Sequence, residues 1–173
     1  YVSSADNRPL VVYGKSGSGK TALMAVAAGR IEADRRLDAT LLARFIGATP
    51  ASSEIRTLIG SLCRQLAKEE KRDKGERPVP AEWNELYRDF RARLARATAE
   101  EPIVMLHDAL DQLGTMDGAR ELQWLPDELP DHAKLIVSVP EADGPEGDCG
   151  RRARNRQAEG PRVEVIPLSE KEG

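Results

Sequence analysis

The alternation of apolar and polar segments along the chain predicts an α/β domain. Short apolar runs predict strands, whereas longer stretches with apolar residues three or four positions apart predict amphipathic helices. The predicted strands cover residues 10–13, 41–46, 103–108, 134–139 and 163–166, and the predicted helices cover residues 20–31, 53–69, 81–99 and 118–124. Because strands and helices alternate, we expect a mainly parallel central sheet, joined by right-handed crossovers and flanked by helices.

Two polar segments interrupt this pattern. Residues 70–79 are dense in charge and contain two prolines, which predicts an exposed connector. Residues 141–162 form a predicted polar loop with a basic cluster, Arg151-Arg152-Ala153-Arg154-Asn155-Arg156. Most such clusters are solvated surface. The alternatives are a contact with nucleic acid or phosphate and an arginine finger in an assembled oligomer.

A phosphate-binding motif directly follows the first predicted strand. It has the pattern G-x-x-x-x-G-K-[ST] and consists of Gly14, Lys15, Ser16, Gly17, Ser18, Gly19, Lys20 and Thr21. Glycines allow the backbone to curl with positive φ, so that successive N–H groups converge on one anion at the start of the next helix. Lys20 is expected to neutralise the β- and γ-phosphates, and Thr21 to offer its hydroxyl to Mg²⁺. The sequence therefore predicts a nucleoside triphosphate site in a three-layer P-loop NTPase fold.

A second acidic element is expected to complete the metal site. The apolar run Ile103–Leu106 leads through His107 to Asp108. An acid at the carboxyl end of a buried parallel strand faces the nucleotide, so we interpret Asp108 as the partner of Mg²⁺, through a water. Ser138 ends the later strand at the same edge. It either contacts the γ-phosphate or the attacking water, or is an ordinary strand-end serine.

The residues around Asp108 narrow the class of protein. The stretch D-A-L-D-Q-L, residues 108–113, carries a small residue, Ala109, after the first acid and has its second acid, Asp111, three positions on. Together with R-F-I-G-A-T-P at residues 44–50 and the strand that ends at Ser138, this stretch resembles the NACHT branch of the STAND class of signal-transduction ATPases. NACHT domains usually carry an acid after the second Asp, where this chain has Gln112.

That resemblance implies a Mg-ATP-binding switch domain with slow hydrolysis. The reaction would be in-line attack of water on the γ-phosphate, with Lys20 and Mg²⁺ offsetting the developing charge. Asp111 would orient or activate that water, although it could equally cap a helix that starts there. The expected partners are ATP or ADP, other modules of a parent chain and, on activation, further copies in a homo-oligomer that controls an effector module.

Two other functions use the same phosphate loop. A phosphotransferase acting on a small molecule would need an acceptor-binding lid with clustered arginines, for which Arg151–Arg156 is the candidate. A nucleotide-dependent scaffold without turnover is the other alternative, and Ala109 and Gln112 keep it open.

Composition agrees with one cytoplasmic domain over residues 1–173, which we expect to be excised from a larger multidomain protein. With 40% hydrophobic residues the chain can bury one core. No apolar run approaches the roughly 18 residues of a membrane span, and no signal peptide opens the sequence. The net charge of −3 offers no general attraction for nucleic acid or anionic lipid. Of the two cysteines, Cys63 is expected in the core and Cys149 in the polar loop.

A few further residues have competing interpretations. Arg44, a charge in an apolar strand, either pairs with an acid at the sheet edge or approaches the nucleotide. His107 and His132 have no neighbouring ligands and are expected to be surface or packing residues. The apolar residues of the third predicted helix share one face, which indicates core packing rather than a base-stacking surface; they are Trp83, Leu86, Phe90 and Leu94.

Overall fold

The computed structural model describes residues 1–34, 36–70, 78–122, 124, 128–141, 152 and 162–164. Its five strands are parallel and lie in the order β2-β3-β4-β1-β5. They are β1 (Leu10–Gly14), β2 (Thr40–Phe45), β3 (Ile103–Asp108), β4 (Ala133–Pro140) and β5 (Arg162–Glu164). β4 lies between β1 and β3 in this order. Because the strands are parallel, the carboxyl ends of all three lie along the same edge of the sheet. The predicted parallel α/β fold is confirmed.

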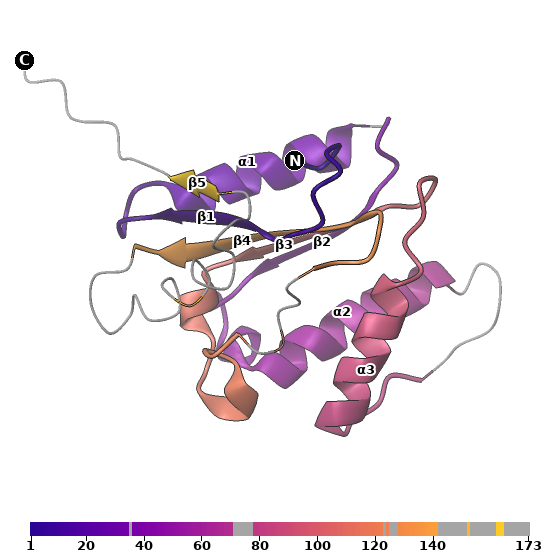
Figure 1. Cartoon of the computed structure of the whole chain (residues 1–173). Coiled ribbons are helices and arrows are strands. Elements are labelled where there is room, and N and C mark those ends of the chain that lie inside the picture. The colour runs from indigo at the N-terminus through magenta and orange to yellow at the C-terminus, as the bar shows by residue number, and fades with distance from the viewer. Residues whose placement is uncertain are drawn as a thin grey trace, which may run out of the picture.

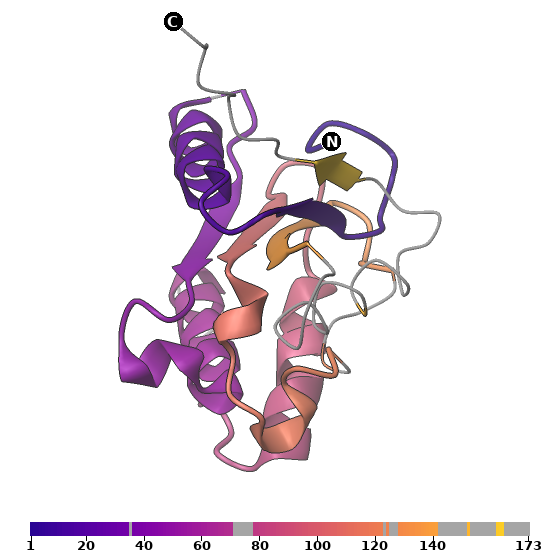
Figure 2. The same ribbon diagram turned by 90° about the vertical axis from the view of Figure 1, so that its left-hand side faces the viewer.

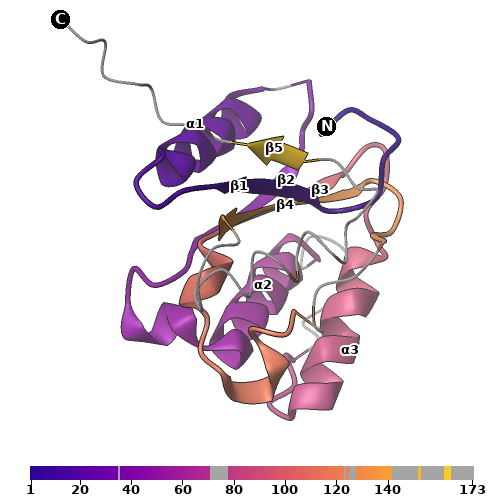
Figure 3. The ribbon, with the colours of Figure 1, turned by 60° about the vertical axis from the view of Figure 1, so that its left-hand side comes forward.

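Helices cover both faces of the sheet (Figures 1 and 3). The helix α1 (Lys20–Ala33) lies on one face, and α2 (Ile55–Glu70) and α3 (Trp83–Leu94) lie on the other. Three short 3-10 turns follow strands β2 and β3: η1 (Pro50–Ser53), η2 (Leu110–Gln112) and η3 (Met116–Gly118). This arrangement gives the three predicted layers.

The larger hydrophobic core lies between the sheet and the pair α2 and α3. It includes Leu42, Met105 and Leu135 from the strands, and Leu62 and Phe90 from the helices. A smaller cluster on the other face packs Met24 and Ala28 of α1 against the sheet. Every residue of β3 is buried, as expected of a central parallel strand that is covered on both faces.

Two predictions about this core are confirmed. The apolar residues of the third helix pack into the larger core, where Leu86, Phe90 and Leu94 are buried and Trp83 is partly buried. Cys63 is buried in the same core. Cys149 lies outside the described residues.

The predicted boundaries of the third helix need correction. The third helix is shorter than residues 81–99: Glu82 caps its start by accepting from the N–H of Glu85, and Ala95 ends it. The N–H groups of Arg96 and Ala97 bond the carbonyl groups three residues earlier, so the chain tightens into a 3-10 type turn after α3.

The predicted helix over residues 118–124 is wrong. The described residues of this segment form the end of η3 and a series of turns. Asp117, Gly118 and Leu122 have φ angles of 54°, 65° and 55°. Left-handed conformations at these positions break the helical hydrogen-bond series. Trp124 is nevertheless buried, with its ring N–H donating to the carbonyl oxygen of Ala119 at 3.0 Å.

Much of the predicted connector and of the predicted polar loop lies outside the described residues. Of the connector 70–79, residues 71–77 lie outside the described residues, as do most of the loop 141–162 and its basic cluster apart from Arg152. The last predicted strand appears as β5, and Val165 and Ile166 lie outside the described residues. Within the described parts of the chain no helix is long and apolar enough to cross a membrane, and the 16-residue α2 is the longest among them.

Candidate nucleotide-binding site

The phosphate loop connects β1 to α1, as its motif requires. Figure 2 views the sheet from the edge where the strands end, with this loop between β1 and α1. Gly17 and Gly19 have φ angles of 76° and 94°, whereas Gly14 is nearly extended at 158°. The positive φ predicted for these glycines is therefore observed at all three, and Gly17 and Gly19 are the two with left-handed angles. No atom lies within 4 Å of a Cβ built on either of these two, so the space beside the loop backbone is open.

Two side chains of the loop bear on the predicted triphosphate site. The ammonium group of Lys20 donates to the carbonyl oxygens of Gly14 and Lys15, both at 2.8 Å. It therefore curls back across the loop, over the positions where an anion would meet the backbone N–H groups. The hydroxyl of Ser18 is buried and has no hydrogen-bond partner among the described residues. A buried polar atom without a partner is rare, and a phosphate oxygen of a bound nucleotide would provide a partner here.

Asp108 and Ser138 meet at the ends of the adjacent strands β3 and β4. The Ser138 hydroxyl donates to Oδ1 of Asp108 at 2.5 Å and accepts from the N–H of Ala109 at 2.8 Å. Asp108 is only 3% exposed and Ser138 only 1%. Ser138 also lies opposite Val12 of β1. The strand register therefore brings the carboxylate and the hydroxyl to the edge where the phosphate loop begins.

The backbone turns sharply immediately after Asp108. Ala109 is left-handed, with φ 62° and ψ 56°, which costs a residue with a Cβ about 1 kcal/mol or more. The hydrogen bond from its N–H to Ser138 helps to hold this conformation. Ser138 thus fixes both the metal-binding candidate and the turn that leads to Asp111.

Asp111 lies inside the turn η2 and is partly buried. Since η2 has three residues and Ala109 is its N-cap residue, the alternative that Asp111 caps a helix starting there is wrong. The side-chain amide of Gln112 donates to Oδ2 of Asp111 at 2.7 Å. Asp111 is therefore a constrained carboxylate at the carboxyl edge of the sheet, where it can act on a water.

The structure also supports the expected fit to Mg²⁺. Thr21 is exposed in the first turn of α1. Among the described residues no group of three or more His, Cys, Asp or Glu side chains could hold a metal ion by itself. Mg²⁺ typically binds through one or two protein ligands together with phosphate oxygens and waters. Thr21 and Asp108 provide such a partial set, so the metal would arrive with the nucleotide.

Within the described ranges, the hydrogen bonds of Arg44 run neither to an acid nor to the phosphate loop, the two alternatives considered for it. It lies on β2, and its guanidinium donates to the hydroxyl oxygen of Ser61, to Oε1 of Gln65 and to the carbonyl oxygens of Ala43 and Ser61, at 2.8–3.3 Å. Ser61 and Gln65 belong to α2, so Arg44 fastens this helix to the edge strand. Within the described residues no carboxylate bonds it. Burial lowers the pKa of Arg44, and the nearby charge of Arg64 adds to this effect.

His107 is a packing residue, as expected. Its ring is fully buried, 6.1 Å from the ring of Trp124, and within the part of the chain that the structure describes neither ring nitrogen has a hydrogen-bond partner. Burial lowers its pKa to about 3, with a smaller contribution from the charge of Arg44. His107 is therefore neutral at physiological pH. His132 is exposed in the turn before β4, which agrees with the expected surface position.

The structure also reveals contacts that the sequence analysis missed. Lys134 of β4 is 5% exposed, and its ammonium group donates to the carbonyl oxygens of Ser4 and Asp6. It thereby fastens the N-terminal segment to the sheet. Gly47 lies against the side chain of Gln112, although no periodicity connects two residues so far apart in the sequence. The sequence offers one indication of this contact, namely that Gly47 belongs to the R-F-I-G-A-T-P segment.

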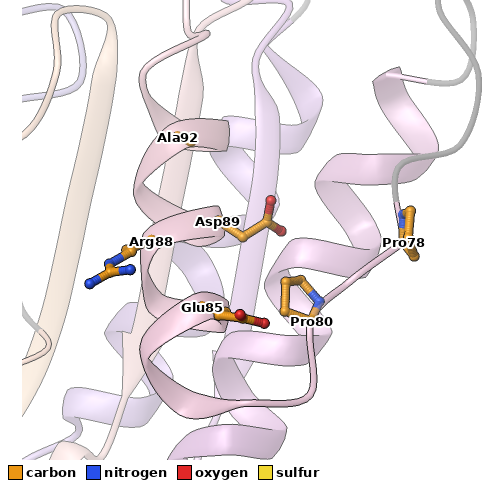
Figure 4. Close-up of a pocket in the computed structure, with 6 residues that line it drawn as sticks. All are labelled: Pro78, Pro80, Glu85, Arg88, Asp89 and Ala92. Atoms are coloured by element: carbon orange, nitrogen blue, oxygen red, sulfur yellow. The ribbon is translucent and has the colours of Figure 1, made fainter.

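A separate hollow of about 480 Å³ lies beside α3, on the opposite face of the sheet from α1 (Figure 4). It is lined by Pro78, Pro80, Glu85, Arg88, Asp89 and Ala92. Arg88 points away from the two prolines, whereas Asp89 forms a buried ion pair with Arg93 at 2.7 Å. None of the residues predicted to bind nucleotide lines this hollow.

Comparison with known proteins agrees with this geometry. The model of the family described as "AAA ATPase domain" matches residues 2–138, which include the phosphate loop, Asp108, Asp111 and Ser138. The chain belongs to this AAA ATPase domain family. It is a nucleotide-binding domain, and members of the family bind nucleotide with Mg²⁺.

Relatives place this AAA ATPase domain in the NACHT branch. The chain is 35% identical over 137 residues to the human NACHT and WD repeat domain-containing protein 2, which covers 76% of this chain. It is 30% identical over 138 residues to the human NACHT domain- and WD repeat-containing protein 1, which covers 79%. The predicted STAND-class, NACHT-like P-loop NTPase is therefore confirmed. The chain spans only 8% and 9% of the length of these relatives.

A solved structure supports the fold. The ORC1 protein of Aeropyrum pernix, in a complex with DNA, superposes with a TM-score of 0.53 at 18% sequence identity. The match covers 94% of this chain and 40% of that protein. At this level of identity the likeness concerns the three-layer architecture alone.

Proposed function

We propose that this AAA ATPase domain is a Mg-ATP-binding, slowly hydrolysing switch in a NACHT-like signalling protein. The observation that carries the proposal is the placement of the phosphate loop and Asp108 at the same edge of the parallel sheet, with Ser138 on the strand between them. Lys20 and the loop N–H groups would bind the phosphates. Thr21 and Asp108 would hold Mg²⁺, which when bound offsets negative charge on the phosphate oxygens.

Asp111 is the proposed residue for orienting the attacking water. It follows Asp108 by one tight turn, and Ser138 and Gln112 limit the freedom of that turn through their hydrogen bonds. Orientation rather than full proton removal suits phosphoryl transfer, in which positioning and charge stabilisation supply most of the catalysis. Ser138 would act by holding the Asp108 carboxylate in place, rather than by contacting the γ-phosphate.

A switch requires that ATP and ADP favour different states of the protein. A nucleotide changes a conformational equilibrium only through its different affinities for the two states. When nucleotide binds, Lys20 would exchange the two carbonyl oxygens that it bonds here for phosphate oxygens. Other modules of the parent chain would respond to this change, and the active form would be a homo-oligomer. Nucleic acid is not a proposed partner.

Single-turnover hydrolysis, together with affinities for Mg-ATP and Mg-ADP, tests the proposal. The wild type should bind both nucleotides and hydrolyse ATP slowly, whereas Asp111→Ala should bind with similar affinity and lose turnover. Exposed Glu32, in the last turn of α1, offers a charge-matched control in Glu32→Ala. Binding without turnover in the wild type would favour a nucleotide-dependent scaffold, and transfer of phosphate to an added acceptor would favour a phosphotransferase.

A further inference from the structure

The loop after β2 is joined to the segment after β3 at two points. The N–H of Ile46 donates to the carbonyl oxygen of Asp108 at 3.1 Å, and the N–H of Gly114 donates to the carbonyl oxygen of Ser53 at 2.8 Å. Residues 46–53 and 108–114 therefore run together along the carboxyl edge of the sheet. Asp111 lies between the two connections, so its position depends on both segments.

Gly47 brings the two segments into close contact. Its φ is +82°, and a Cβ built on it would lie 3.0 Å from Cβ and 3.1 Å from Cγ of Gln112. These distances are shorter than an ordinary contact between carbon atoms. A side chain at position 47 would therefore push Gln112 away, in addition to straining the backbone. Glycine allows the loop after β2 to support the stem of Gln112 directly.

The supported side chain of Gln112 holds one oxygen of Asp111. Its Nε2 is 2.7 Å from Oδ2 of the carboxylate. An ionised carboxylate accepts hydrogen bonds only, so the amide must present its NH₂ group, and not its oxygen, to Asp111. This contact occupies Oδ2 and leaves Oδ1 to receive a hydrogen bond from a water.

We infer that Gln112, supported by Gly47, is a positioning residue that orients Asp111 for attack by water. The inference rests on the proposed hydrolytic function, because it gives Gln112 no role apart from Asp111. Gln112 touches neither phosphate nor metal in this scheme. Its removal should therefore slow turnover without weakening the binding of Mg-ATP.

The test compares three quantities in the full chain: the single-turnover rate constant, the Kd for Mg-ATP and the midpoint of thermal unfolding. Gln112→Ala should lower the rate constant roughly tenfold, because the carboxylate loses its fixed orientation. Its Kd and unfolding midpoint should stay close to those of the wild type. Exposed Thr115 provides a control in Thr115→Ala, which should leave all three quantities unchanged.

Gly47 gives an independent test through the contact itself. Gly47→Ala should slow turnover about as much as Gln112→Ala, because the added methyl group displaces Gln112. In the double variant, where Gln112 is already truncated, Gly47→Ala should slow turnover no further. Its effect on stability should persist in both backgrounds, since the positive φ remains.

The outcomes separate this inference from the proposed function. If Gln112→Ala turns over within twofold of the wild type while Asp111→Ala is inactive, the positioning role is wrong and the hydrolytic function stands. Equal losses in rate, affinity and stability would show a merely structural role and would also overturn the inference. If the wild type has no turnover, the hydrolytic function and the positioning role both fail.

Discussion

The phosphate loop and the Asp108–Ser138 pair lie at the same edge of the sheet but are built differently. The loop is mostly exposed, and its Lys20 bonds carbonyl oxygens of the loop itself. Asp108 and Ser138 are buried and already bonded to each other. Ligand binding can therefore rearrange the loop at small cost, whereas the pair is fixed in advance. In the proposed function, the loop would respond to nucleotide and the pair would stay in place for hydrolysis.

The largest effect is expected from Lys20→Ala. This change removes the cation that the motif directs at the β- and γ-phosphates, so affinity for Mg-ATP should fall by about 100-fold or more, equivalent to about 3 kcal/mol. Titration calorimetry measures this loss, with Lys68→Ala on the exposed surface of α2 as a charge-matched control. Equal affinities for the two variants would mean that the loop is not the responsive part.

A change in the Asp108–Ser138 pair should instead lower the free energy of unfolding even when no nucleotide is bound. Ser138→Ala leaves the buried Asp108 carboxylate and the N–H of Ala109 without this partner. Each unsatisfied buried group costs roughly 1–3 kcal/mol, so the free energy of unfolding should fall by about 2–4 kcal/mol. Urea unfolding tests this, with exposed Ser3→Ala as the control. A loss below about 0.5 kcal/mol would contradict a pair fixed in advance.

The buried end of β3 also predicts a specific dependence on pH. Because burial lowers the pKa of His107 to about 3 in the folded state, only the unfolded chain takes up its proton between about pH 6.5 and pH 3. The stabilisation is fully present above about pH 6.5 and is lost as the pH falls. At pH 5 the free energy of unfolding is lower by about 2 kcal/mol than at high pH because of this residue.

The measurement for His107 is urea unfolding between pH 8 and pH 5. His107→Phe fills the site with an aromatic ring that does not titrate, so it should lose about 2 kcal/mol less than the wild type over this range. Exposed His132→Phe should follow the wild type. Parallel curves for the wild type and His107→Phe would show that the ring is not excluded from water.

The smallest effect is expected within the loop. Gly17 has a φ of 76° but open space where a Cβ would lie, so Gly17→Ala suffers backbone strain without a clash. The free energy of unfolding without nucleotide should fall by about 1 kcal/mol. A loss as large as that of Ser138→Ala would remove the contrast between the two regions.

The same contrast explains what could be predicted from the sequence. The phosphate loop is a local motif in which each position has its own chemical reason, so its residues and its place between a strand and a helix were predictable. The bond between Asp108 and Ser138 depends on the register of two strands separated by 30 positions in the sequence. Sequence placed both residues at one edge of the sheet but could not assign the hydroxyl to the carboxylate.

The wrong predictions have a similar origin. Residues 118–124 have a helical pattern of apolar side chains, but left-handed residues at 117, 118 and 122 turn the chain so that Trp124 can pack beside His107. Arg44 looked exceptional in an apolar strand, and its partners are uncharged groups of α2, 17 and 21 positions away. Tertiary packing overrode the local pattern in both cases.

The most direct test of the account is the effect of Mg²⁺ on ATP affinity in the wild type and in Asp108→Asn. Asparagine keeps the shape of the side chain and can still accept from Ser138, but it removes the negative charge that would hold the metal. The account predicts that Mg²⁺ raises ATP affinity at least about tenfold in the wild type, and at most about twofold in Asp108→Asn. The same enhancement in both proteins would contradict a Mg-ATP site formed jointly by the phosphate loop and Asp108.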